Sequence, residues 1–297
     1  VAAKSAKQLG VRFEEKLLGD HPPGLYRLDL ASEFRLAAVR DDENMAATPG
    51  PMLVFLHGTA SSTQSSFGKL WDSANTEGQR LRQTLAPMYG NRVFALEHRS
   101  LSESPIDNAL ALVRRLPQGA ELHLVSHSRG GLVGEVLALS GCPNLAEVLS
   151  PEKIRTLFAA DRSMAPQLGL SPLSDDEAKT RDAAYESDRQ RLQELVKSMG
   201  QKQLRISRFV RVATDPRILP GIEAMMPGSA LTRLLNGTPE LVTSADLSVI
   251  AGDIQAGDGL WNTLKVLASD WFYRNEHDLV VDTGSMSGGL PRLGSSG

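Results

Sequence analysis

Short continuous apolar runs alternate along the chain with longer segments in which apolar residues recur every three or four positions. Runs of strand length lie at 51–56, 92–96, 122–125, 209–213 and 247–251. Helical periodicity marks residues 77–88, 105–113 and 130–139. A fully apolar strand is typical of a sheet covered on both faces, and strands alternating with helices at this spacing favour parallel pairing. The pattern therefore predicts an α/β protein with a mostly parallel central sheet and helices on both faces.

Two of the predicted helices carry identifiable local signals. Ser104 is expected to cap the helix that begins at Pro105, because a serine followed by proline is typical of a helix start. In the preceding helix, Leu81, Leu85 and Met88 are spaced to lie on one side. We therefore expect these three side chains to face the core.

Two regions depart from the alternation. Residues 24–40 hold two short alternating segments, which predict an opening antiparallel pair. Residues 141–205 form a long excursion that contains a capping box at 174–177 and then a highly charged helix, predicted to end at Gly200. This insertion is either a lid over a site or a solvated surface helix, and the sequence leaves both interpretations open.

Composition narrows the functional classes. The 297 residues are 41% hydrophobic with a net charge of −3, which argues against a nucleic-acid partner. The single Cys142 excludes an intramolecular disulfide framework and a Cys-rich zinc site. No run approaches the ~18 apolar residues of a transmembrane segment, and nothing near Val1 resembles a signal peptide, so a cytoplasmic location is expected. Neither a metal-binding motif nor a glycine-rich nucleotide loop occurs, so no metal or cofactor is expected.

The strongest chemical signal follows the strand at 122–125. The sequence there reads Ser-His-Ser-Arg-Gly-Gly and then enters an apolar helix, which matches the small-x-Ser-x-Gly pattern of a nucleophile elbow. The sharp turn strains the backbone of Ser128, so the residues two positions away must be small. Gly130 satisfies this requirement on one side, and Ser126 replaces the more usual glycine on the other. Ser128 is therefore a candidate nucleophile at a helix N-terminus, where N–H groups and the helix dipole stabilise negative charge.

A nucleophilic serine also needs N–H donors for the charge that develops on its tetrahedral intermediate. The backbone N–H of Arg129 directly follows the candidate nucleophile and is one such donor. The sequence His57-Gly58-Thr59 follows the strand at 51–56 in the position where the second donor is expected. The backbone N–H of Thr59 is therefore the second candidate.

The segment 52–139, with a patch near 275–286, resembles the α/β-hydrolase superfamily on its lipase/esterase side. The resemblance is carried by LVFLHGTASST, SFGKLW, FALEHRSLSESPIDNALALVRRLP, HLVSHSRGGLVGE and NEHDLVVDTGSM. It looks closest to the lipase-like domains related to GPI inositol deacylases, which also occur inside large bacterial multidomain proteins. The resemblance implies an α/β-hydrolase fold and hydrolysis of an acyl ester by a Ser–Asp–His triad in that chain order.

The resemblance points to Asp278 as the acid of the triad. Its role would be to hold the catalytic imidazole in the right tautomer and to stabilise the charged form. Asp253 and Asp258 compete with it, because they follow the predicted strand at 247–251 and the end of that strand is a usual position for the acid. The absence of any acid also stays open.

The base is missing from its usual place, because no histidine follows His277. His277 adjoins Asp278, and adjacent side chains on an extended segment point apart. His57 is expected to support the oxyanion loop and His127 to pack beside the elbow, while His98 either faces the substrate or is structural; all three are candidates for a place near the substrate. Three explanations follow: a fragment whose histidine lies further along the parent chain, a degenerate hydrolase, or a non-standard histidine base.

These observations predict a single α/β-hydrolase domain over residues 1–297, with a lid-like insertion near 141–205, taken from a longer multidomain chain. The expected activity is cleavage of a small-molecule or lipid ester through an acyl-enzyme on Ser128. The alternative is a catalytically incomplete hydrolase-fold module that binds a ligand or a partner within a larger protein. A thioesterase or an amidase would use the same machinery.

Overall fold

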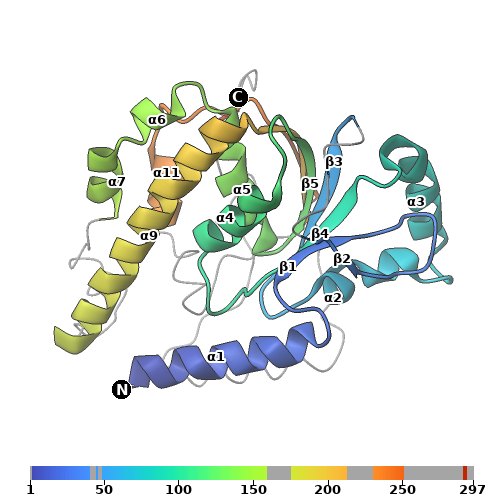
Figure 1. The fold of residues 1–297 in the computed structure, drawn as a ribbon, viewed down its shortest axis with the longest axis horizontal. Coiled ribbons are helices and arrows are strands. Elements are labelled where there is room, and N and C mark those ends of the chain that lie inside the picture. The colour runs from blue at the N-terminus through green and yellow to red at the C-terminus, as the bar shows by residue number, and fades with distance from the viewer. Residues whose placement is uncertain are drawn as a thin grey trace.

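The central feature of the molecule is one mixed β-sheet flanked by helices (Figure 1). A computed structural model describes residues 2–40, 45, 49–158, 175–212, 230–250 and 290–292. Within these residues the sheet has seven strands in the order β2-β1-β4-β3-β5-β6-β7. The pairs β1–β2 and β1–β4 are antiparallel, and the four pairs from β4 through β3, β5 and β6 to β7 are parallel. The protein is therefore an α/β protein with a mostly parallel sheet.

The strands are short, and helices connect most of the parallel ones. The strands are β1 (Gly24–Arg27), β2 (Ala37–Ala38), β3 (Met52–Leu56), β4 (Val93–Glu97), β5 (Glu121–His127), β6 (Arg205–Val212) and β7 (Asp246–Ile250). The helices before β5 are α1 (Ala2–Leu18), α2 (Thr63–Phe67), the 3₁₀ helix η2 (Gly68–Trp71), α3 (Thr76–Tyr89) and α4 (Pro105–Arg115). Those after β5 are α5 (Gly130–Ala138), the 3₁₀ helix η3 (Leu139–Gly141), α6 (Leu145–Val148), α7 (Pro151–Leu157), α9 (Asp175–Lys202) and α11 (Ala230–Gly237).

Two hydrophobic cores lie on opposite faces of the sheet. Met52, Val54 and Leu56 of β3 pack in the larger core, together with side chains from α4, α5 and α9. Leu53 and Phe55 point the other way, into a smaller core with residues of α2, η2 and α3. Because every position of β3 is covered, the strand is continuously apolar, as its sequence predicts.

Most of the predicted elements are confirmed. The opening antiparallel pair forms, with Tyr26 opposite Ala38. All five predicted parallel strands overlap a strand of the sheet. Ser104 caps α4: its hydroxyl accepts from Asp107 N–H at 3.2 Å, and the Asp107 carboxylate accepts from Ser104 N–H at 3.3 Å.

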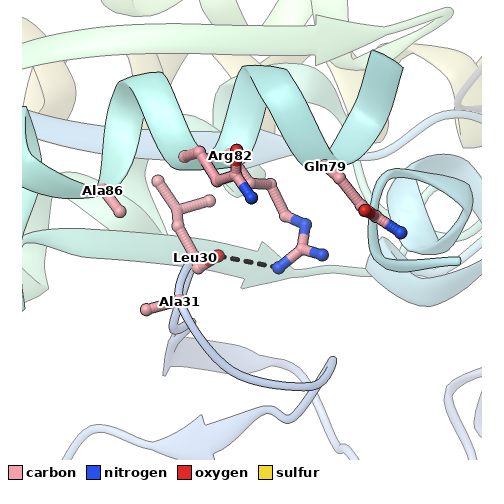
Figure 2. Close-up of a pocket in the computed structure, with 6 residues that line it drawn as sticks. Leu30, Ala31, Gln79, Arg82 and Ala86 are labelled. Atoms are coloured by element: carbon pink, nitrogen blue, oxygen red, sulfur yellow. Dashed lines mark hydrogen bonds between the residues drawn. The ribbon is translucent and has the colours of Figure 1, made fainter. Parts of the chain in front are cut away.

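The predicted buried side of α3 is wrong in two of its three positions, because Leu81 and Met88 are 46% and 53% exposed. The inward side carries Arg82 instead. Its guanidinium lies over the Trp71 ring at 5.6 Å, and its Nη1 donates to the Leu30 carbonyl at 2.8 Å (Figure 2). The stem of an arginine can cover apolar surface while its head reaches carbonyl oxygens, so the apolar spacing indicated the wrong face.

The charged helix α9 continues to Lys202, two residues past the predicted end at Gly200. Lys202 Nζ donates to the Arg114 carbonyl of α4 at 2.9 Å, and Gln203 then leaves the helix with a φ of +52°. The C-terminal half of α9 packs against α4, and its core side chains are Leu192, Leu195, Val196 and Met199. This half of the helix is therefore amphipathic rather than fully solvated. Ser174 of the predicted capping box lies outside the described residues.

Candidate active site

Ser128 lies in the sharp turn between β5 and α5, with a φ of +50°. A non-glycine residue rarely adopts a positive φ, which costs roughly 1–3 kcal/mol and persists only where neighbouring groups hold it. Ser128 N–H donates to the Val212 carbonyl at 3.0 Å, and its own carbonyl accepts from Gly131 N–H at 2.8 Å. The side chain is half-buried, and its hydroxyl makes no hydrogen bond with any described residue. The positive φ confirms the strained turn that the small-x-Ser-x-Gly pattern predicts.

Two glycines allow the end of β3 to touch this turn. A Cβ on Gly58 would lie 2.9 Å from Ser128 Cβ, and a Cβ on Gly130 would lie 2.3 Å from the Leu56 carbonyl oxygen and 2.8 Å from that of His57. All three separations are shorter than the 3.0 Å below which real Cβ atoms essentially never approach another atom. The fold therefore brings the loop after β3 into contact with Ser128, and it requires glycine on both sides of the contact.

The loop after β3 presents three successive N–H groups beside this contact. Gly58 N–H points to Ser66 Oγ at 3.4 Å, and Ala60 N–H donates to Ser100 Oγ at 2.9 Å. Among the described residues, no hydrogen bond uses Thr59 N–H. Arg129 is the residue that precedes α5, so its backbone lies at the helix N-terminus. Thr59 and Arg129 thus lie on the two segments that meet at Ser128.

His57 and His98 are stacked in the interior, with ring centroids 3.9 Å apart and 0% and 3% of the two residues exposed. The Gly58 carbonyl lies 3.0 Å from His57 Nδ1, and His98 N–H donates to His57 Nε2 at 3.2 Å, which indicates a neutral ring protonated on Nδ1. Burial lowers the pKa of both imidazoles, and that of His98 falls well below its usual value. Both rings are enclosed by protein, so support of the loops after β3 and β4 fits them better than contact with a substrate.

Glu97 joins this buried pair from the end of β4. Its Oε1 accepts from Thr63 N–H at 2.9 Å, and its Oε2 lies 3.4 Å from His57 Nε2. The carboxylate therefore holds the start of α2 through Oε1, whereas Oε2 has no hydrogen-bond partner among the described residues. It is fully buried, as are the rings beside it.

His127 has its recorded contacts with α2 and not with the hydroxyl of its neighbour Ser128. Its Nδ1 lies 3.3 Å from Ser66 Oγ, and Ser66 Oγ lies 2.9 Å from Ser61 Oγ. The ring also makes an edge contact with Phe67, with centroids 6.4 Å apart. Burial lowers the pKa of His127. This places His127 beside the elbow, against α2.

The side chain of Arg129 is completely buried, although no pattern in the sequence predicts this. Its Nη1 donates to Asn108 Oδ1 at 2.9 Å and its Nη2 to the Glu103 carbonyl at 2.5 Å. Burial lowers the pKa of the guanidinium to about 10, while the negative charges of Glu14, Glu103 and Asp107 oppose that decrease. Arg129 therefore braces the loop between β4 and α4.

Glu14 is the second residue that sequence reasoning missed. It belongs to α1, far from Ser128 in the sequence. It is nonetheless only 2% exposed, and its carboxylate accepts a hydrogen bond from Leu101 N–H in the loop after β4. No motif marks it, because a glutamate in an amphipathic helix is ordinarily a solvated residue. Only the packing of α1 against the loop reveals it.

The candidate acids Asp253, Asp258 and Asp278 lie outside the described residues, as does His277. Their positions relative to Ser128 stay predictions. Within the described parts of the chain, no three His, Cys, Asp or Glu side chains converge as metal ligands. A depression of about 390 Å³ lies between α3 and the loop after β1, lined by Leu30, Ala31, Gln79, Arg82, Gln83 and Ala86 (Figure 2). None of these residues belongs to the segments that meet at Ser128.

Fold and site together define an α/β protein with a solvent-accessible serine in a strained strand-to-helix turn. Residues 24–294 match the model of a family described as "Domain of unknown function (DUF7379)", and the chain belongs to that family. Helix α1 precedes the matched segment. No curated protein matches the chain. In the part of the chain that the structure describes, no helix is both long and apolar enough to cross a membrane.

Proposed function

We propose that this protein is a serine hydrolase of the α/β-hydrolase type that cleaves a carboxylic ester through an acyl-enzyme on Ser128. The observation that carries the proposal is the strained turn at Ser128, a half-buried residue directly before Arg129 and the start of α5. The mostly parallel sheet, the antiparallel opening strands and the helices on both faces support the same fold. A small-molecule or lipid ester is the proposed substrate class.

In the proposed reaction, Ser128 Oγ bonds to the ester carbonyl carbon while its proton passes to a base. The carbonyl oxygen becomes an oxyanion, which Thr59 N–H and Arg129 N–H would stabilise. Collapse of the intermediate breaks the bond to the alcohol, which leaves with the proton from the base. A water molecule then repeats the sequence, releases the carboxylic acid and restores Ser128.

The base is the open part of this proposal. Of the six histidines, five lie in the described residues, and none of these hydrogen-bonds to Ser128. His123, for example, bonds through Nδ1 to the Tyr89 hydroxyl at 2.5 Å. We therefore propose that the base is none of these five. If it is His277, which adjoins Asp278, then Asp253 or Asp258 supplies the acid; with any other base the acid is Asp278.

A fluorophosphonate probe tests the proposal, because it reacts covalently with activated serines. We expect the probe to label the folded protein at Ser128 and labelling to disappear in Ser128→Ala. Ser73→Ala, at an exposed serine before α3, is the matched control and should label normally. His277→Asn should abolish labelling if this residue is the base. A folded protein that the probe does not label would contradict the hydrolase proposal.

A second function, a binding module with a hydrolase fold, is favoured by one observation. Among the described residues, no imidazole is bonded to the serine hydroxyl, so the reactive pair of a triad is not assembled there. A module of this kind predicts a protein that is folded, inert to the probe and unable to turn over p-nitrophenyl esters. Probe labelling of Ser128 would exclude it.

A further inference from the structure

Glu14 inserts a buried carboxylate into the loop between β4 and α4. Its Oε1 accepts from Leu101 N–H at 2.5 Å, and its Oε2 accepts from Ser102 N–H at 3.2 Å and from the Ser102 hydroxyl at 2.5 Å. Three donors on one carboxylate, at 2% exposure, make a tightly specified contact. The next residue of α1, Glu15, is exposed and lies 4.0 Å from Arg99.

The loop that Glu14 holds is also hydrogen-bonded to the loop after β3, which carries the candidate oxyanion donor Thr59. Ser100 adjoins Leu101, is 1% exposed, and its Oγ accepts from Ala60 N–H at 2.9 Å. Ala60 has a φ of +46°, a strained conformation that persists only when its surroundings hold it. Thr59, the candidate oxyanion donor, immediately precedes Ala60. A continuous path of hydrogen bonds and backbone therefore runs from α1 to Thr59.

The negative charge of Glu14 also acts on a residue next to Ser128. The Glu14 carboxylate lies close enough to the buried Arg129 guanidinium to stabilise its positive charge, and Arg129 directly follows Ser128. Figure 1 shows α1 along the lower edge of the molecule. The family match begins at residue 24, so α1 lies before the shared domain even though it contributes a buried group to this loop.

We propose that Glu14 is a positioning residue: it fixes the Leu101–Ser102 backbone, which through Ser100 and Ala60 sets the Thr59 N–H that stabilises the oxyanion. This inference rests on the proposed function for its catalytic consequence. The mechanical coupling from α1 to Ala60 is a property of the fold and can be measured without any activity.

The test compares Glu14→Ala with Glu15→Gln, its exposed neighbour on the same helix. An oxyanion donor acts in the transition state, so its displacement lowers kcat while KM stays nearly constant. For Glu14→Ala we expect about a 10- to 100-fold slower fluorophosphonate labelling of Ser128, and the same loss in kcat on p-nitrophenyl acetate. Glu15→Gln should retain the normal rates. Amide hydrogen exchange, followed by mass spectrometry on peptides spanning 57–62 and 99–103, should rise in both peptides for Glu14→Ala only.

Ser100→Ala removes the link between the two loops and completes the design. If Ser100 carries the coupling, the double variant with Glu14→Ala should label no more slowly than the slower single variant. Multiplied losses would refute this path. Glu14→Gln keeps one acceptor oxygen and replaces Glu14→Ala in this test if the alanine variant does not fold. In Glu14→Gln, Ser128 should be labelled about threefold more slowly than in Glu15→Gln. Equal rates for the two folded glutamine variants would overturn the proposal.

The exchange measurement separates failure of this inference from failure of the proposed function. If the unsubstituted protein is not labelled, the hydrolase proposal is wrong. The amide hydrogen exchange of the two peptides then tests the coupling from Glu14 to Ala60 by itself. Faster exchange confined to residues 99–103, with the 57–62 peptide unchanged, would show that Glu14 stabilises only its own loop. That result would overturn the inference whatever the protein hydrolyses.

Discussion

Gly130 and Gly200 offer the same substitution, glycine to alanine in a helix, with opposite expected results. At Gly130 a Cβ would lie 2.3 Å from the Leu56 carbonyl oxygen, and contacts below 3.0 Å do not occur, so the two must separate by at least 0.7 Å (3.0 minus 2.3). Leu56 is fully buried and pairs with both Leu96 and Ser126, so its carbonyl cannot withdraw without straining two ladders. At Gly200 a Cβ would meet nothing within 4 Å.

Crowding of this kind costs about 1–3 kcal/mol, whereas replacing an uncrowded helical glycine by alanine stabilises by roughly 0.5–1 kcal/mol. We therefore expect Gly200→Ala to be slightly more stable than the unsubstituted protein and Gly130→Ala to be less stable. At roughly 2–4 °C per kcal/mol, thermal unfolding resolves the difference, and urea unfolding gives the free energies. Gly130→Ala should also label more slowly with fluorophosphonate, because Ser128 shifts with the start of α5. A Gly130→Ala variant as stable as Gly200→Ala would refute the close-approach argument.

Three further predictions follow from buried groups. Burial lowers the folded-state pKa of His98, so the unfolded chain binds the additional proton and stability falls as pH drops below about 6.5. His98→Gln should therefore reduce the slope of the urea-unfolding free energy against pH, and an unchanged slope would be contrary evidence. Glu135 is fully buried, and its carboxylate lies 2.8 Å from the Arg292 guanidinium and 3.3 Å from that of Arg211. Glu135→Gln removes this negative charge from both arginines and should lower the unfolding free energy by roughly 3–5 kcal/mol. A change below about 1 kcal/mol would argue against a buried ion cluster. Burial raises the pKa of the Cys142 thiol to about 11, so the native protein should react with a thiol reagent at pH 8 far more slowly than the protein unfolded in guanidinium; equal rates would contradict that environment.

The regular elements were largely predictable because their signals are local. A fully apolar run bounded by polar residues predicted β3, and Ser104 before Pro105 predicted the start of α4. The elbow was likewise predictable, because a strained strand-to-helix turn requires small residues at fixed positions. Gly130 is the clearest case, since the contact that excludes a side chain there comes from the end of β3.

Other features depend on which segments meet. Apolar spacing placed Leu81 and Met88 in the core, but the partner that α3 meets accommodates Arg82 instead. His98 follows a strand end, a position typical of site residues, yet it packs against His57 in the interior. In both cases the local sequence fixes the element, whereas the neighbouring elements decide which side chains are covered.

The sequence by itself determined the strands, the helix caps and the position of Ser128 in a tight turn, because these follow from backbone sterics and short-range hydrogen bonds. Only the tertiary structure decided the roles of Glu14, Arg129 and Glu135. Each is a charged side chain whose chemistry depends on distant partners: Glu14 on the loop after β4, Arg129 on Asn108, and Glu135 on the segment at 290–292. A buried charge is stable only beside its counter-charges and hydrogen-bond partners, and the fold alone brings those together.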